Sequence, residues 1–123
     1  MRSDREITPL TPTLAVGAQI RAEDLRTLAD NGFTDIVCNR PDEEHPEDSP
    51  SLIMEEIATR LGMTFHYLPI TPNALFDRQA RRLAELTATP DAKVFAYCRS
   101  GARSTNAWAY AQAMLANSHS QPA

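Results

Sequence analysis

The residues best suited to chemistry form one short run, Cys98-Arg99-Ser100-Gly101-Ala102-Arg103-Ser104. The run directly follows the apolar stretch Lys93–Tyr97 and opens a segment with a helical spacing of apolar residues. A cysteine thiolate is a nucleophile, and the unpaired N–H groups at a helix start stabilise both a thiolate and a neighbouring oxyanion. The sequence therefore predicts a cysteine anion-binding loop between a buried strand and a helix.

Each position in this loop has an expected role. Cys98 is the predicted nucleophile, and Arg103 offers a planar, two-pronged guanidinium to an oxyanion. Gly101 lets the backbone turn so that its amide groups face a common centre. Ser104 is expected to donate a hydrogen bond to the thiolate or, later, to a leaving sulfur. The remaining substrate-binding candidates are Arg99, Ser100 and Ala102, and the Arg99 side chain faces either the ligand or the solvent.

Four short apolar runs are the predicted strands, and helical patterns fall between them. The run ending in Cys38 and the run ending in Tyr97 do not alternate with polar residues, which is typical of strands covered on both faces. Strand–helix alternation of this kind predicts a mostly parallel sheet flanked by helices. Ligands of such sheets bind outside the carboxyl ends of the strands, and Cys98 stands at one such end. The predicted strands are Leu14–Ala18, Thr34–Cys38, Thr64–Pro69 and Lys93–Tyr97.

The helix boundaries follow from capping and breaking residues. Asn31-Gly32 is expected to end the first helix, Ser49-Pro50 to begin the second and Thr71-Pro72 to begin the third. The fourth is expected from about Gly101 to Leu115. We therefore expect one α/β domain over residues 1–123, with its core at about 7–115, an extended entry segment at 1–12 and a frayed polar tail at 116–123.

Composition narrows the range of partners. The chain has 123 residues, one ordinary domain, and a formal net charge of −4, which argues against nucleic acid or an anionic membrane as the main partner. Local positive potential can still bind a small anionic substrate. Neither a signal peptide nor a membrane span is recognisable, so a cytoplasmic, reducing setting is expected. The acidic stretch around His45 lacks metal-ligand spacing, and neither a metal nor a cofactor is expected. The sequence does not indicate an oligomeric state.

Three segments resemble a bacterial family of beta-lactamase-hydrolase-like or phosphatase-like domains, some of them fused to persulfide-metabolising enzymes. The segments are Leu10–Gln19, Gly32–Glu44 and Tyr97–Ser104. Phe65–Ile70 adds a resemblance to dual-specificity phosphatases. The resemblance implies a cysteine-phosphatase-like α/β fold. The cysteine loop also looks like that of single-domain rhodaneses, the sulfurtransferases that carry a cysteine persulfide.

Loop length and the placement of acidic residues favour sulfur chemistry over phosphate chemistry. Cysteine phosphatases resemble one another in having five residues between the cysteine and the arginine, whereas four separate Cys98 from Arg103. The aspartate that follows the equivalent of Tyr67–Ile70 in dual-specificity phosphatases is also absent. Asp42 or Asp77 is then the candidate general acid, and a capping turn is an equally good interpretation of Asp42.

We therefore expect a sulfurtransferase that moves sulfane sulfur from thiosulfate or a persulfide to a thiol acceptor through a Cys98 persulfide. Its predicted catalytic residues are Cys98, Arg103 and Asp42. One alternative is a phosphatase that forms a phosphocysteine at Cys98. A second is a non-catalytic anion or redox sensor that uses Cys98 and Cys38.

Overall fold

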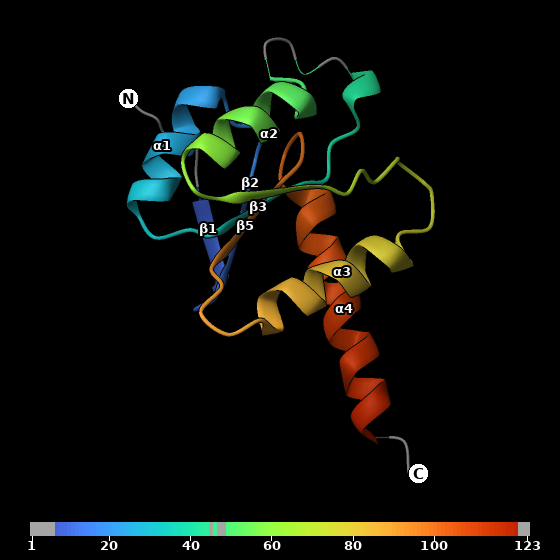
Figure 1. The fold of residues 1–123 in the computed structure, drawn as a ribbon. Helices are drawn as coiled ribbons and strands as arrows, with labels where there is room; N and C mark the ends of the chain where they lie inside the picture. The colour runs from blue at the N-terminus through green and yellow to red at the C-terminus, as the bar shows by residue number, and fades with distance from the viewer. Residues whose placement is uncertain (1–6, 45, 47–48, 121–123) are drawn as a thin grey trace.

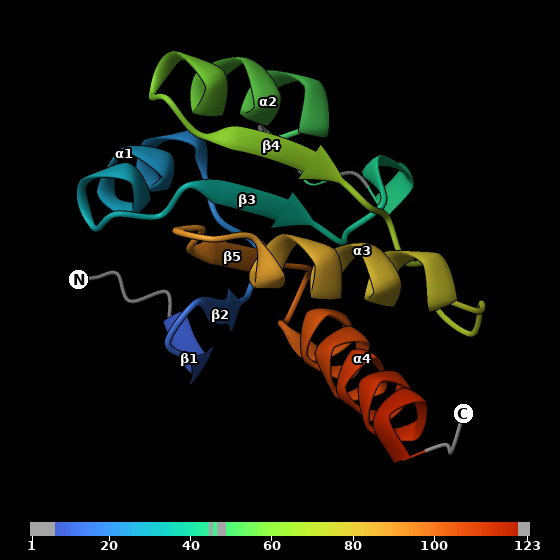
Figure 2. The same ribbon diagram turned by 60° about the horizontal axis from the view of Figure 1, so that its bottom comes forward.

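The computed structural model describes residues 7–44, 46 and 49–120, with side chains as far as Ala116. Five strands form one sheet in the order β1-β2-β5-β3-β4, and four helices cover its two faces (Figures 1 and 2). The strands are β1 Ile7–Thr11, β2 Leu14–Gly17, β3 Asp35–Cys38, β4 Thr64–Tyr67 and β5 Val94–Tyr97. The helices are α1 Ala22–Asp30, α2 Ser51–Arg60, α3 Asp77–Ala88 and α4 Ala102–Ser120, with a 3₁₀ turn at Asp42–Glu44.

Each face of the sheet carries its own apolar core. Alternate strand residues point to opposite faces, so that Phe95 joins the layer under α1 and α2, whereas Val94 joins the layer under α3 and α4. Figure 2 shows the two helix pairs on opposite sides of the strands. All four residues of β5 are buried, because this strand is central and covered on both faces. The predicted α/β class with a mostly parallel sheet is confirmed.

The four parallel strands end at the same level. In the register, Gly17 lies beside Tyr97, Tyr97 beside Cys38, and Cys38 beside Tyr67. The segments that follow these residues therefore emerge together along one edge of the sheet. This edge is the place where the cysteine loop begins.

Several boundaries differ from the expectations. The entry segment contains β1, which pairs antiparallel with β2, and an edge strand accommodates its Pro9 beside a register shift. The third helix begins at Asp77 rather than at Thr71-Pro72, because a turn follows in which Asn73 has a φ of 67°. The N-cap of α2 is Pro50 rather than the expected Ser49, and the N-cap residue makes no side-chain hydrogen bond to the helix.

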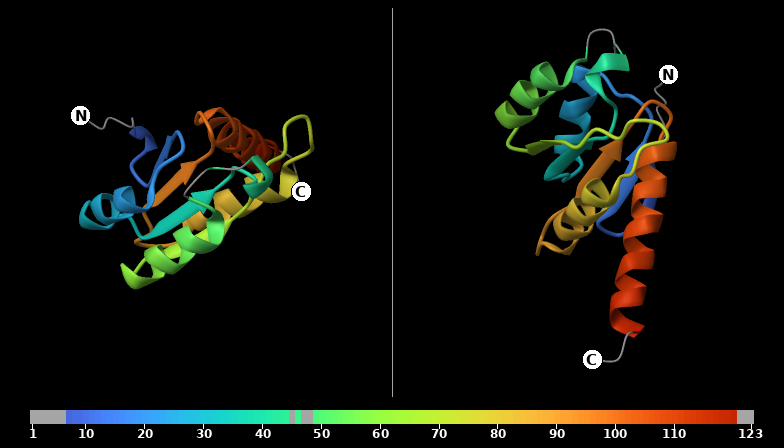
Figure 3. Two further views of the ribbon diagram at one scale, coloured as in Figure 1. Left: turned by 90° about the horizontal axis from the view of Figure 1, so that it is seen from above. Right: turned by 90° about the vertical axis from the view of Figure 1, so that its right-hand side faces the viewer.

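The last helix is longer than expected. It continues to Ser120, so the described part of the predicted frayed tail is helical. Figure 3 shows α4 extending well past the end of the sheet. Its first turn lies against the strand ends, so the helix presents its amino terminus to the cysteine loop.

The cysteine loop depends on a close approach between two backbones at Gly101. This residue has a φ of 95°, and a Cβ built on it would lie 3.3 Å from both the carbonyl carbon and the oxygen of Gly17. Gly62 has a similar φ of 86°, but a Cβ there would meet nothing within 4 Å. A side chain at either glycine would therefore strain the backbone, but only a side chain at Gly101 would also contact neighbouring atoms.

We predict that Gly101→Ala destabilises the protein more than Gly62→Ala. Backbone strain alone should cost roughly 1–2 kcal/mol in each variant, and Gly101→Ala adds the contact with Gly17, which is backbone and cannot rotate away. Urea denaturation followed by circular dichroism measures both losses. Equal losses would show that the approach to Gly17 is unimportant.

Candidate active site

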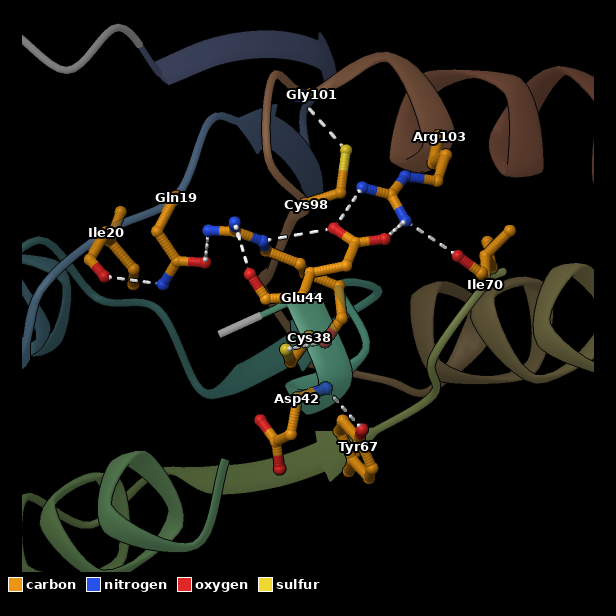
Figure 4. A network of polar contacts seen from close by, with 11 residues as sticks. Gln19, Ile20, Cys38, Asp42, Glu44, Tyr67, Ile70, Cys98, Gly101 and Arg103 are labelled. Carbon is orange, nitrogen blue, oxygen red and sulfur yellow. Dashed lines mark hydrogen bonds and ion pairs between the residues drawn. The ribbon is translucent and has the colours of Figure 1, made fainter. Parts of the chain in front are cut away.

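Cys98 stands immediately after β5, at the centre of the edge where the parallel strands end. Its side chain is fully buried. The N–H of Gly101 donates to Cys98 Sγ at 3.1 Å, and the N–H of Cys98 donates to the Gly17 oxygen at 3.3 Å. Figure 4 shows the sulfur inside the turn that leads into α4. One loop amide thus donates to the thiol at the start of α4, a position where unpaired N–H groups favour an anion.

The other loop positions divide into exposed and buried ones. Arg99, Ser100 and Ala102 are exposed, and the N–H of Ala102 donates to Ser100 Oγ at 3.3 Å. Ser104 is fully buried, and its hydroxyl donates to Asn39 Oδ1 at 2.8 Å. The Ser104 hydroxyl thus binds the Asn39 side chain, whereas we expected it to donate to the Cys98 thiolate.

Arg103 is held by a carboxylate that the sequence analysis does not single out. Its Nη1 donates to Glu44 Oε2 at 2.7 Å and its Nη2 donates to Glu44 Oε1 at 2.9 Å. Nη1 also donates to the Ile70 oxygen at 2.8 Å (Figure 4). Hydrogen bonding to Arg103 lowers the pKa of Glu44, and the same bond raises the pKa of Arg103. Glu44 is therefore an anion at neutral pH.

A second guanidinium supports Glu44. Arg40 Nε donates to Glu44 Oε1 at 3.2 Å, and Arg40 Nη2 donates to the Glu44 main-chain oxygen at 3.3 Å. The third nitrogen, Nη1, donates to Gln19 Oε1 at 3.2 Å. The N–H of Gln19 in turn donates to the Arg99 oxygen at 3.3 Å, which closes the network onto the cysteine loop. Arg40 and Arg103 thus share one carboxylate, that of Glu44.

Asn39 is the second residue that the sequence analysis misses. It follows β3 directly and is almost completely buried. Its side-chain amide donates from Nδ2 to the Leu68 oxygen at 2.8 Å, and its Oδ1 accepts the Ser104 hydroxyl. A polar residue immediately after a buried strand is the signal that points to this position, because only a hydrogen-bonded amide tolerates such burial.

Both candidate acids accept hydrogen bonds from residues outside the cysteine loop. Both carboxylate oxygens of Asp42 accept bonds from Ser51, Oδ1 from its N–H at 2.9 Å and Oδ2 from its hydroxyl at 2.6 Å. This is the capping contact, made to the first residue of α2. Asp77 Oδ2 accepts the Tyr110 hydroxyl at 3.0 Å, at the start of α3. The acid role of either residue stays a prediction without a supporting contact.

Cys38 differs from Cys98 in its surroundings. Its thiol donates to the Arg40 oxygen at 3.3 Å, and burial raises its pKa. In Figure 4, Cys38 lies on the opposite side of Glu44 from Cys98, and both cysteines are free. A raised pKa keeps Cys38 in the unreactive thiol form.

The described residues contain neither a candidate metal cluster nor a membrane-spanning helix. No three histidine, cysteine or acidic side chains within residues 7–44, 46 and 49–120 are placed to share a metal ion. His66 instead contacts Asp35 at 2.8 Å. His45 lies outside the described residues. Over the same ranges, no helix combines the length and the apolar character that crossing a bilayer requires.

Comparison with known proteins identifies the family to which the chain belongs. Residues 6–115 match the family described as "Beta-lactamase hydrolase-like protein, phosphatase-like domain". The chain belongs to this family. A beta-lactamase hydrolase-like protein of Xylella fastidiosa (strain Temecula1) is 22% identical over 107 residues, which cover 87% of this chain. The match covers 25% of that relative, so the phosphatase-like domain spans about a quarter of the length of the curated relative.

Solved structures agree with this family. A candidate phosphatase from Neisseria meningitidis is 28% identical, with a TM-score of 0.74, and the match covers 94% of this chain and 80% of that one. The kinase-associated phosphatase, solved with its catalytic cysteine replaced by serine, shares the fold at a TM-score of 0.65. It is 17% identical, and the match covers 82% of this chain and 68% of that one. The phosphatase-like domain thus has a cysteine-phosphatase-like fold.

These findings correct the expected chemistry. The sulfurtransferase interpretation is wrong, because the family and the neighbouring structures are phosphatase-like. No finding supports the thiol acceptor that was expected with it. The error lies in the weight given to loop length. The family match includes the loop from Cys98 to Arg103, so a four-residue gap is compatible with membership of a phosphatase-like family.

We predict that Asp42→Ala lowers stability by about 1–2 kcal/mol, as loss of a helix cap does, because α2 loses both contacts from its first residue. Urea denaturation measures this loss. Activity on an alkyl phosphate, whose leaving group needs a proton, should fall no more than activity on an aryl phosphate. Unchanged stability with a selective loss on the alkyl phosphate would instead establish Asp42 as the general acid.

Proposed function

We propose that this domain is a cysteine-dependent phosphatase that hydrolyses phosphate monoesters through a phosphocysteine at Cys98. The observation that supports this most directly is the hydrogen bond from the Gly101 N–H to Cys98 Sγ at 3.1 Å, at the start of α4. A donor in this position stabilises a thiolate, and the helix start favours negative charge beside it. Arg103 adds a guanidinium to the same centre.

The proposed reaction has two steps. The Cys98 thiolate attacks phosphorus, the S–P bond forms, and the bond to the leaving oxygen breaks with its electron pair. Water then attacks phosphorus, the S–P bond breaks, and inorganic phosphate leaves while the thiolate returns. The loop amides and Arg103 stabilise the negative charge on the phosphoryl oxygens in both steps.

The first test uses the unmodified protein and an aryl phosphate, because a phenolate leaves without protonation and the assay does not depend on the identity of an acid. We expect hydrolysis that Cys98→Ser abolishes and Cys38→Ser leaves largely intact, since Cys38 is a buried thiol with a raised pKa. Mass spectrometry after acid quenching should show a phosphate adduct on Cys98. No hydrolysis, or hydrolysis that survives Cys98→Ser, would overturn the proposal.

The two arginines of the loop should respond differently to lysine. Lysine keeps the charge but lacks the planar fork, so Arg103→Lys should raise the barrier by on the order of 2–3 kcal/mol, as for other charged hydrogen bonds. Arg99 is exposed, and Arg99→Lys should leave kcat/KM within about twofold, as for a surface substitution. Similar effects at both positions would show that neither guanidinium binds the phosphoryl group.

A further inference from the structure

The guanidinium of Arg103 has two edges that can each bind an anion, and the Glu44 carboxylate occupies one of them. Arg103 presents its end, formed by Nη1 and Nη2, to the Glu44 carboxylate. The second hydrogen of Nη1 goes to the Ile70 oxygen. Neither Glu44 nor Ile70 uses the edge formed by Nε and the remaining N–H of Nη2, whose donors point in one direction.

The edge that Glu44 leaves free lies on the side of the Cys98 thiol (Figure 4). Cys98 lies beside the guanidinium in Figure 4, and its proximity contributes to the raised pKa of Arg103. A phosphoryl group attached to Cys98 would therefore meet the Nε edge without displacing Glu44. The carboxylate holds the plane of the guanidinium and does not occupy the place of the substrate.

Glu44 itself is fixed from several directions. Arg40 binds its carboxylate and its main-chain oxygen, and both side chains are mostly shielded from solvent, with 12% of Arg40 and 25% of Glu44 exposed. The 3₁₀ turn that carries Glu44 is anchored at Asp42, whose N–H donates to the Tyr67 hydroxyl at 2.9 Å. A carboxylate held in this way transmits its position to Arg103. Arg40 and Arg103 together bring two positive charges to the single negative charge of Glu44.

We propose that Glu44 is a positioning residue, supported by Arg40, which fixes the Arg103 guanidinium so that its Nε edge faces the transferred phosphoryl group. The proposal rests on the proposed phosphatase function for its kinetic part. Its geometric part concerns oxyanion binding and does not require turnover.

The test compares three variants of the full chain. Glu44→Gln removes the charge and turns an acceptor into a donor, whereas Glu44→Asp keeps the charge but shortens the side chain by one methylene. Glu43→Gln is the matched control, because it removes the same charge from an exposed neighbour in the same turn. A merely electrostatic role for Glu44 would spare Glu44→Asp, whereas a positioning role would not.

The first readout is the affinity for vanadate, a transition-state-like oxyanion, measured by its protection of Cys98 against alkylation. We expect both Glu44 variants to lose about tenfold or more, the scale on which small misplacements of catalytic groups act, and Glu43→Gln to match the unmodified protein. Vanadate binding equal to or tighter than that of the unmodified protein in either Glu44 variant would overturn the proposal, because Glu44 would then be a bystander, a competitor or only a charge.

The second readout separates binding from chemistry. With an aryl phosphate, kcat should fall about tenfold in both Glu44 variants while KM changes by less than about threefold, as expected when an interaction with the transition state is lost. A rise in KM alone would contradict a positioning role. If the unmodified protein shows no turnover, the proposed function fails, while loss of vanadate binding in the Glu44 variants still upholds the geometric inference.

A measurement on the unmodified protein covers the case in which the Glu44 variants do not fold. In side-chain nitrogen NMR, the bidentate contact should slow rotation of the Arg103 guanidinium and give separate Nη1 and Nη2 signals. The exposed Arg99 serves as the internal control and should show averaged signals. Averaged signals for Arg103 as well would overturn the proposal.

Discussion

One buried amide residue ties the strand ends of this domain together. The main-chain N–H of Asn39 donates to the Tyr97 oxygen at 2.7 Å, and its carbonyl accepts from the Ile70 N–H at 2.9 Å. Its side chain binds the Leu68 oxygen and the Ser104 hydroxyl. All four polar groups of Asn39 are thus hydrogen-bonded, each to a different residue. A buried amide that lost one of these partners would leave an unsatisfied group in the interior, which is costly.

Two arginines lie close together in a protein whose net charge is negative. The protein carries a formal net charge of −4, yet Arg40 and Arg103 share a single carboxylate, that of Glu44. The lowered pKa of Glu44 means that this cluster adds to stability above the usual carboxyl range. The contribution is lost as the pH falls through the lowered value in the folded state. Net charge therefore says little about the sign of the potential at the site.

The sequence predicts what is encoded locally and misses what depends on register. The cysteine loop is a contiguous run after a buried strand, so its position and its helix start are predictable from spacing alone. Glu44 and Asn39 act on residues about sixty positions away, and their role appears only when β3 and β5 lie side by side. The strand β1 is missed because Pro9 and Pro12 indicate irregular chain, although an edge strand tolerates proline.

The expectation of sulfur transfer is wrong for a different reason. Counting four residues between Cys98 and Arg103 assumes that ring size alone decides which anion fits. The structure shows that the position of the arginine is also set from outside the loop, by Glu44 and Ile70. Residues beyond the motif therefore help to fix the position of Arg103, and the length of the motif does not reveal these contacts.

The close approach of Gly101 to Gly17 also couples the stability of the cysteine loop to that of the sheet. The N–H of Cys98 bonds to Gly17, and the loop that follows Gly17 bonds to Arg99, so the cysteine loop cannot open without disturbing the end of β2. Local opening of the site is then energetically close to opening of the central strands, and amide exchange in the two regions becomes linked. An oxyanion bound in the loop would consequently slow exchange in β2 and β5 and raise the melting temperature of the whole domain.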